Sequence, residues 1–196
     1  MNIRAYSAEL LGTFLLALLV HLSIGANFPI ATPLVAGLTL GLIVYLFGAI
    51  SGAHVNPAVT IALASIDKIS WKEAGFYILS QCIGAGAAFL FARGLLGNSV
   101  SLTVGTSMPI LAAEAIGAGI LVLGVSSVVH SKASCDASGL TIGTALALGA
   151  LAASVQSNGV LNPAVALGIG SLSIAYVIGP IVGGVIAAQM YRAIAK

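Results

Sequence analysis

Six long apolar stretches run through this sequence, and they constrain the fold more than any other feature. Each has about 20 mostly apolar residues, the length at which an α-helix crosses the hydrocarbon core of a bilayer. Hydrophobic residues make up 59% of the 196 residues and charged residues only 6%, against roughly 25% charged in a soluble domain. The sequence therefore predicts an all-α integral membrane protein whose six spans lie at roughly 6–24, 33–50, 71–93, 109–130, 139–156 and 173–193.

No break in composition divides the chain, so we interpret 1–196 as a single membrane domain. We expect the first apolar run to be retained as a helix, because Glu9 interrupts it and a secretory signal rarely tolerates a charge there. The net charge of +2 is too small and too dispersed to indicate a nucleic-acid partner. Cys82 and Cys135 form no C-x-x-C pair and argue against a disulfide framework or a redox site.

Two further apolar runs, 57–66 and 163–171, are too short to span and begin with the same tripeptide. The tripeptides are Asn56, Pro57 and Ala58 in one run and Asn162, Pro163 and Ala164 in the other. An Asn caps a helix well, and Pro suits the first helical position. Ten helical residues reach about 15 Å, half of the bilayer core. A helix that begins at the midplane needs protein or a water-lined cavity for its free backbone donors, so we predict two re-entrant half-helices that meet there.

The two tripeptides belong to an internal repeat. "AELLGTFLLALLV" (8–20) resembles "AEAIGAGILVLGV" (113–125), which places Glu9 and Glu114 105 positions apart, and Asn56 and Asn162 are 106 apart. "YILSQCIGA" (77–85) resembles "YVIGPIVGG" (176–184). Each half, approximately 6–93 and 109–193, holds three spans and one half-helix. Three is odd, so the second half is inverted, and short helices at matching positions in inverted repeats indicate a transport path.

The basic residues predict the orientation. With both termini in the cytoplasm, six basic residues lie inside and one lies outside, as the positive-inside rule favours. The six are Arg4, Lys68, Lys72, Lys132, Arg192 and Lys196, and the one outside is Arg93. We expect a multi-pass protein of a prokaryotic plasma (inner) membrane.

With its two Asn-Pro-Ala half-helices, "SGAHVNPAVT" (51–60) and "GPIVGG" (179–184), the chain resembles the aquaporin, or major intrinsic protein, family over about residues 6–192. The resemblance implies a channel for water or small uncharged solutes, six spans with two half-helices, and a homotetramer with one pore per subunit. It implies that the amides of Asn56 and Asn162 donate to the passing oxygen and that Glu9 and Glu114 hold the re-entrant loops. It also implies that His54 lines the cytoplasmic vestibule.

The chain departs from the family at the filter. Most members carry Arg directly after the second tripeptide, where this chain has Val165. The other three filter positions fall on Ala36, Ala150 and Gly159, and Ala166 stands where glycerol-conducting members often have Asp. These residues predict a wide apolar filter that passes solutes larger than water, such as glycerol. The alternative is that Leu161 or Tyr45 leans in and refills the space.

Two other functions stay open: a non-conducting structural member of the same fold, and a secondary transporter built on broken helices. Coupled transport usually needs ionisable groups inside the membrane, and the two candidates, Glu9 and Glu114, are assigned to the loops. The three histidines are too scattered for a metal site: His21, His54 and His130. The sequence has no nucleophile–base pair or phosphate loop, so we expect no enzyme, cofactor or metal.

Overall fold

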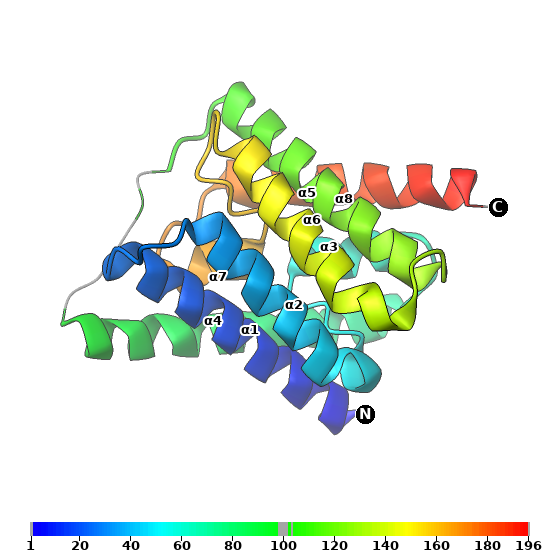
Figure 1. Ribbon diagram of the computed structural model, residues 1–196, viewed down its shortest axis with the longest axis horizontal. Helices are drawn as coiled ribbons and strands as arrows, with labels where there is room; N and C mark the ends of the chain where they lie inside the picture. The colour runs from blue at the N-terminus through cyan, green and yellow to red at the C-terminus, as the bar shows by residue number, and fades with distance from the viewer. Residues whose placement is uncertain (1, 98–101, 103, 196) are drawn as a thin grey trace.

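A computed structural model describes residues 2–97, 102 and 104–195. Over these residues the chain forms eight α-helices and one 3-10 turn, with no strand (Figure 1). In order, they are α1 (Ile3–Gly25), α2 (Thr32–Ser51), α3 (Pro57–Ser65), α4 (Trp71–Leu96), α5 (Met108–Val129), η1 (Cys135–Ala137), α6 (Ser138–Ala153), α7 (Pro163–Gly168) and α8 (Ile174–Ile194).

Local signals in the sequence explain where these helices begin and end. Pro occupies one of the first two positions of α2, α3, α5 and α7, where its missing N–H is not needed. Ser70 caps α4 by accepting a hydrogen bond of 3.2 Å from the backbone N–H of Glu73. Gly52 and Gly97 end α2 and α4 in the left-handed conformation, at φ 85° and 71°.

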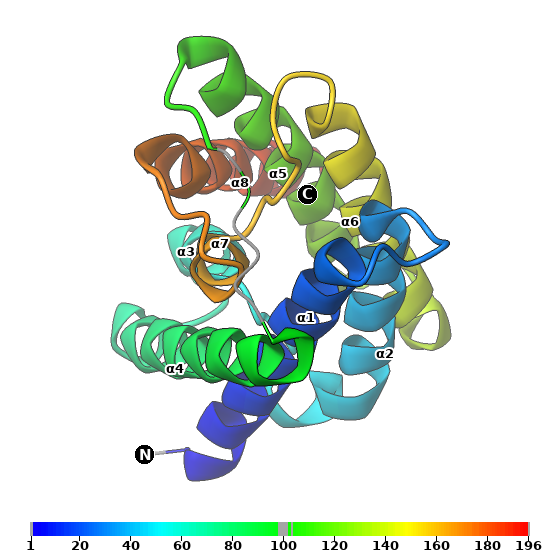
Figure 2. The same cartoon turned by 90° about the vertical axis from the view of Figure 1, so that its left-hand side faces the viewer.

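The two halves pack in matching pairs. α1 lies against α2 and α4, as α5 lies against α6 and α8, and α2 joins the halves by packing on α6. Each half-helix also packs on the other half, because α3 contacts α8 and α7 contacts α4. Figure 2 shows the two half-helices, α3 and α7, enclosed between α4 and α8. This exchange places both half-helices between α4 and α8, where most of their side chains are buried.

Glycines at equivalent positions permit the closest helix contacts. A Cβ atom at Gly84 of α4 would overlap the carbonyl of Leu10 on α1, and one at Gly183 of α8 would overlap the carbonyl of Ala115 on α5. The two glycines are 99 residues apart, the offset of the repeated segments in α4 and α8. Small residues that let backbones touch are the usual means of helix association in lipid.

The helices are close to the predicted spans, with two exceptions near the second re-entrant loop. Five helices have the length and hydropathy to cross a membrane among the described residues, whereas α6 has only 16 residues, about 24 Å of helix. The predicted span 139–156 is wrong at its end, because α6 stops at Ala153 and the chain continues in turns as far as Ser157. The second half-helix likewise ends at Gly168 rather than at 171, in a turn that leaves Gly170 at φ 67°.

Candidate functional site

The two asparagines of the repeated tripeptides cap the half-helices that they precede. Oδ1 of Asn56 accepts a hydrogen bond of 2.8 Å from the backbone N–H of Ala58. Oδ1 of Asn162 accepts from the N–H groups of Ala164, at 3.0 Å, and Val165, at 3.2 Å. Both side chains are almost fully buried. The cap uses only the side-chain oxygen, so each amide NH₂ group faces away from its own helix.

Each NH₂ group crosses to the other loop. Nδ2 of Asn56 donates a hydrogen bond of 3.0 Å to the carbonyl of Leu161, and Nδ2 of Asn162 donates one of 2.9 Å to the carbonyl of Val55. Each acceptor is the residue directly before the other asparagine. The contact is therefore reciprocal, and it fixes the positive N-terminal ends of α3 and α7 at the same point.

A buried glutamate holds each loop from behind. Glu9 of α1 accepts from the backbone N–H groups of His54, at 2.9 Å, and Val55, at 2.7 Å. Glu114 of α5 accepts from those of Val160, at 3.0 Å, and Leu161, at 2.7 Å. Both carboxylates are fully buried. Hydrogen bonds to a charged group are roughly twice as strong as neutral ones, so these contacts offset part of the cost of burying the charge.

The loops need this support because their backbone is unusual. Ala53 and Val55 have φ of 50° and 41°, and Gly159 and Leu161, at the equivalent positions, have φ of 61° and 58°. For a β-branched residue such as Val55 a positive φ is an outlier, with a cost of roughly 1–3 kcal/mol. Two hydrogen bonds hold Val55 in this conformation. Its N–H donates to Glu9, and its carbonyl accepts from Nδ2 of Asn162.

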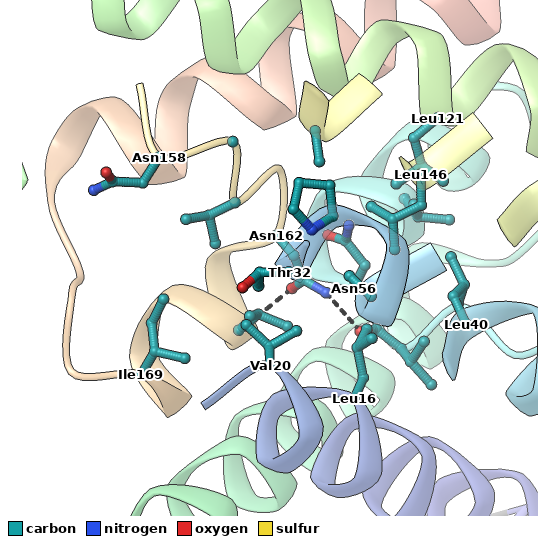
Figure 3. A pocket seen from close by; sticks show the side chains of 18 of the residues that line it. Leu16, Val20, Thr32, Leu40, Asn56, Leu121, Leu146, Asn158, Asn162 and Ile169 are labelled. Atoms are coloured by element: carbon teal, nitrogen blue, oxygen red, sulfur yellow. Dashed lines mark hydrogen bonds between the residues drawn. The ribbon is translucent and has the colours of Figure 1, made fainter. Parts of the chain in front are cut away.

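The cavity formed where the loops meet has a volume of about 100 Å³, room for several waters at about 10–15 Å³ each. Figure 3 shows Asn56 and Asn162 together in it, with Leu16 and Val20 of α1 on one side. The cavity has two opposite ends, because some of its lining residues lie near Thr32, where α2 begins, and others lie near Ser51, where α2 ends. We name them the His54 end, with Ala53 and His54, and the Asn158 end, with Thr32, Pro33 and Asn158.

All four predicted filter positions line this cavity: Ala36, Ala150, Gly159 and Val165. They bring no polar side chain to it. Gly159 lies so close to α6 that a Cβ there would overlap the carbonyl of Ala150. The loop therefore rests directly on a small residue of α6, and the ring is built largely from backbone and methyl groups.

Neither side chain that was expected as a possible filler enters the ring. Leu161 is fully buried and packs on the backbone faces of Gly117 and Gly149. Tyr45 is 55% exposed, and its hydroxyl donates to the carbonyl of Asp136 at 3.0 Å. Tyr45 and Leu161 are both absent from the residues that line the cavity, so the alternative in which one of them refills the ring is wrong.

The His54 end carries polar groups that the Asn158 end does not repeat. Nδ1 of His54 lies 3.2 Å from Oγ1 of Thr60, which also donates to the carbonyl of Asn56 at 2.9 Å and accepts from Nε2 of Gln81 at 3.0 Å. The positions equivalent to these residues in the second half are apolar: Val160, Ala166 and Pro180. The pseudosymmetric site is thus polar at these three positions of the first half and apolar at the equivalent positions of the second half.

Sequence reasoning missed the hydroxyl groups that complete the loop supports. Ser51 donates to Glu9 and Ser157 to Glu114, each at 2.7 Å, and each serine oxygen also accepts from a loop N–H two residues later. The hydroxyls of Tyr77 and Tyr176 bond to the same two loops. The two serines are 106 residues apart and the two tyrosines 99, which match the offsets of the recognised repeats. The spacing could therefore have identified these hydroxyl groups.

Among the described residues, no group of His, Cys, Asp and Glu is arranged to hold a metal ion.

Comparison with known proteins agrees with this geometry. The family model described as Major intrinsic protein matches residues 1–191. Glycerol uptake facilitator protein-like 6 of Lactiplantibacillus plantarum is 35% identical, over 96% of this chain and 97% of its own. Probable aquaporin NIP7-1 of Arabidopsis thaliana is 33% identical, over 98% of this chain and 77% of its own. The aquaglyceroporin from Plasmodium falciparum has the same fold, with a TM-score of 0.76 at 22% identity over 97% of this chain and 96% of that one. Because one family model and these relatives cover nearly its whole length, the chain belongs to the major intrinsic protein family.

Proposed function

As a member of this family the chain is a passive membrane channel for water and small solutes, and we propose that solutes cross it through the cavity between the two half-helices. The observation that carries the proposal is the reciprocal contact of Asn56 and Asn162, both of which line that cavity. The chain is then one channel domain over 1–196, with its repeats at about 6–93 and 109–193.

In this proposal the two asparagines are the central donors of the pore, and the prolines and alanines that follow them start the half-helices. An amide NH₂ group has two hydrogens, and the contact between the loops uses one, so the second is free for a solute oxygen. The two positive helix ends repel cations at the same point. A water oxygen that accepts a hydrogen bond from both amides has used its two lone pairs and cannot also accept one from the next water in line. Water would therefore pass without a continuous proton wire.

The filter positions set the proposed selectivity. Ala36, Ala150, Gly159 and Val165 bring neither a charge nor a bulky side chain to the cavity. Such a ring gives little discrimination between water and a small polyol, since selectivity of this kind depends on pore diameter and lining donors. We therefore infer that glycerol-like uncharged solutes pass with water.

Two further groups have supporting roles. Glu9 and Glu114 keep the loops in their strained backbone conformation, and neither carries protons through the pore. His54 lies at the vestibule, where its ring is held against Thr60 and faces the aromatic ring of Tyr77 with 5.1 Å between the ring centroids. Its place at one end of the cavity supports a role in admitting solute.

We propose that both termini and the His54 end face the cytoplasm of a prokaryotic cell. Lys68, which bonds to the carbonyl of Val129, and Arg192, which pairs with Asp67 at 3.1 Å, lie beside the end of α3, away from the Asn158 end. Arg93 lies at the other end of α4 and stacks on Phe89. This distribution fits the positive-inside rule. Lys196, also expected inside, lies outside the described residues.

We also propose that four copies associate in the bilayer. The outer face of α2 and α6 is a groove with a floor of closely packed glycine backbone and a rim of exposed leucines, among them Leu38 and Leu140. Tight backbone contacts of this kind favour helix association in lipid. The mass of the protein in mild detergent tests the tetramer.

Flux into liposomes tests the function. Purified protein in liposomes should speed water and glycerol equilibration above that of empty liposomes and should not accumulate glycerol against a gradient. Accumulation would indicate a secondary transporter. Absence of any flux from folded protein would indicate a non-conducting structural member.

A further inference from the structure

A residue outside both repeats lines the Asn158 end of the cavity. Leu102 belongs to the connection between α4 and α5, yet it lies among the cavity-lining residues together with Ile24, Pro33 and Ile169. It is partly buried and packs against the hydrophobic core. All four of these side chains are apolar, so this part of the wall offers a solute shape only, and the polar side chains of the cavity beyond the asparagines, Thr32, Ser154 and Asn158, come from other segments.

A buried serine fixes the position of Leu102. Oγ of Ser171 accepts a hydrogen bond of 2.8 Å from the backbone N–H of Leu102 and lies 3.2 Å from the Leu102 carbonyl, to which it donates. Ser171 is only 1% exposed. It directly follows the turn that ends α7, and its hydroxyl also reaches the carbonyl of Ile169 at 3.3 Å. The same serine thus ties Leu102 to the half-helix that carries Val165.

We propose that Leu102 is a specificity-determining residue of the channel, and that its side chain restricts the Asn158 end of the pore. This inference rests on the proposed function. Little steric restriction comes from the ring of Ala36, Ala150, Gly159 and Val165. At the Asn158 end, Leu102 supplies the restriction instead. An apolar side chain at this place penalises solutes by size, because the part of a solute that faces Leu102 must shed water without gaining a hydrogen bond from it. Water loses least, and larger polyols lose most.

The test compares permeabilities of the full chain in liposomes for water, glycerol and erythritol. Leu102→Ala should raise the ratio of erythritol to water permeability by about tenfold, the lower end of what one methylene group decides in an apolar pocket. Leu102→Phe should lower the ratio. Ser171→Ala should shift it in the same direction as Leu102→Ala, because Leu102 is then no longer tied to α7. Val155→Ala is the matched control, since Val155 is an apolar residue at the same end that is 78% exposed and does not line the cavity.

A labelling experiment gives a second readout. In a chain with Cys82→Ser and Cys135→Ser, a polar thiol reagent should block glycerol flux through Leu102→Cys and leave Val155→Cys unaffected. Unchanged permeability ratios in both Leu102→Ala and Leu102→Phe, with wild-type flux intact, would overturn the inference and leave the proposed function standing. Erythritol flux that appears only in Leu102→Ala, with water and glycerol flux already present in the wild type, would support the restriction. If neither wild type nor Leu102→Ala conducts, both proposals are wrong.

Discussion

Nε2 of Gln81 donates a hydrogen bond of 2.8 Å to Oε2 of Glu9, and the repeat does not reproduce this bond for Glu114. The residue equivalent to Gln81, 99 positions later, is Pro180, whose side chain has no donor. Glu9 is therefore tied to α4 through a side-chain amide, whereas Glu114 accepts from the serine and the backbone of its own loop. Pseudosymmetry fixes the positions of the loops, and the two halves stabilise them by different means.

Replacing Gln81 should expose this difference. Gln81→Leu removes the donor to Glu9 and to Thr60 at nearly constant volume, and we expect it to lower the stability of the folded protein by about 1.5–3 kcal/mol, the value of a hydrogen bond to a charged group. The thermal unfolding midpoint in detergent measures this loss. Ser80→Ala, one residue earlier on the same helix, should have a much smaller effect. An unchanged midpoint for Gln81→Leu would show that the bond does not hold the first loop.

Glu114→Gln keeps the shape of the side chain and removes its charge. One of its two side-chain positions becomes an NH₂ group that faces the N–H of Val160 or Leu161, so we expect a loss of about 2 kcal/mol or more together with reduced glycerol flux. Asp67→Asn is the control, because this exposed partner of Arg192 should contribute no more than about 1 kcal/mol. If stability and flux both stay at wild-type values, Glu114 does not support the second loop.

Asn56→Asp and Asn162→Asp replace a donor by an acceptor at the contact between the loops. Each new carboxylate oxygen would face the carbonyl of Leu161 or Val55 and would add a negative charge beside two positive helix ends. We expect reduced water flux or an increased cation leak, measured with an ion-sensitive dye in the same liposomes. Asn158→Asp, at the end of the cavity, should change both much less. Wild-type flux and ion exclusion in the doubly substituted protein would contradict the central role of the two amides.

His21 should anchor the far end of the second half-helix. Its Nδ1 lies 3.0 Å from the carbonyl of Gly168 and must donate, since a carbonyl only accepts. The ring is fully buried. His21→Asn retains a donor near Nδ1 and should stay close to wild type, whereas His21→Leu should cost about 1–3 kcal/mol and reduce flux. Equal midpoints for the two variants would contradict the anchor.

The sequence was sufficient for the parts of this molecule that repeat. The half-helices, the meeting of the two asparagines and the pairing of the glutamates follow from spacing in an inverted repeat, and the resemblance to the family implied that the glutamates hold the loops. The partners of His21, Gln81 and Leu102 could not be predicted in this way. Each makes a bond that has no counterpart in the other half, and these bonds depend on how α1, α4 and Leu102 pack. The early end of α6 could not be predicted either, because the equivalent helix α2 continues to Ser51.

The filter ring itself can be rebuilt with two substitutions. Ala36 and Val165 both line the cavity and are nearly buried, so Ala36→Phe with Val165→Arg would place an aromatic side chain and a fixed positive charge in a ring that has neither. We expect glycerol permeability to fall by about tenfold or more, the scale at which pocket shape discriminates between similar molecules, and water permeability to fall less. Stopped-flow measurements of both solutes in liposomes give the ratio. Leu46→Phe is the matched control, because Leu46 lies on the same helix, is 50% exposed, and lines neither the cavity nor the outer groove of α2 and α6. A wild-type protein that passes water and rejects glycerol would show that the ring is narrow despite its small residues.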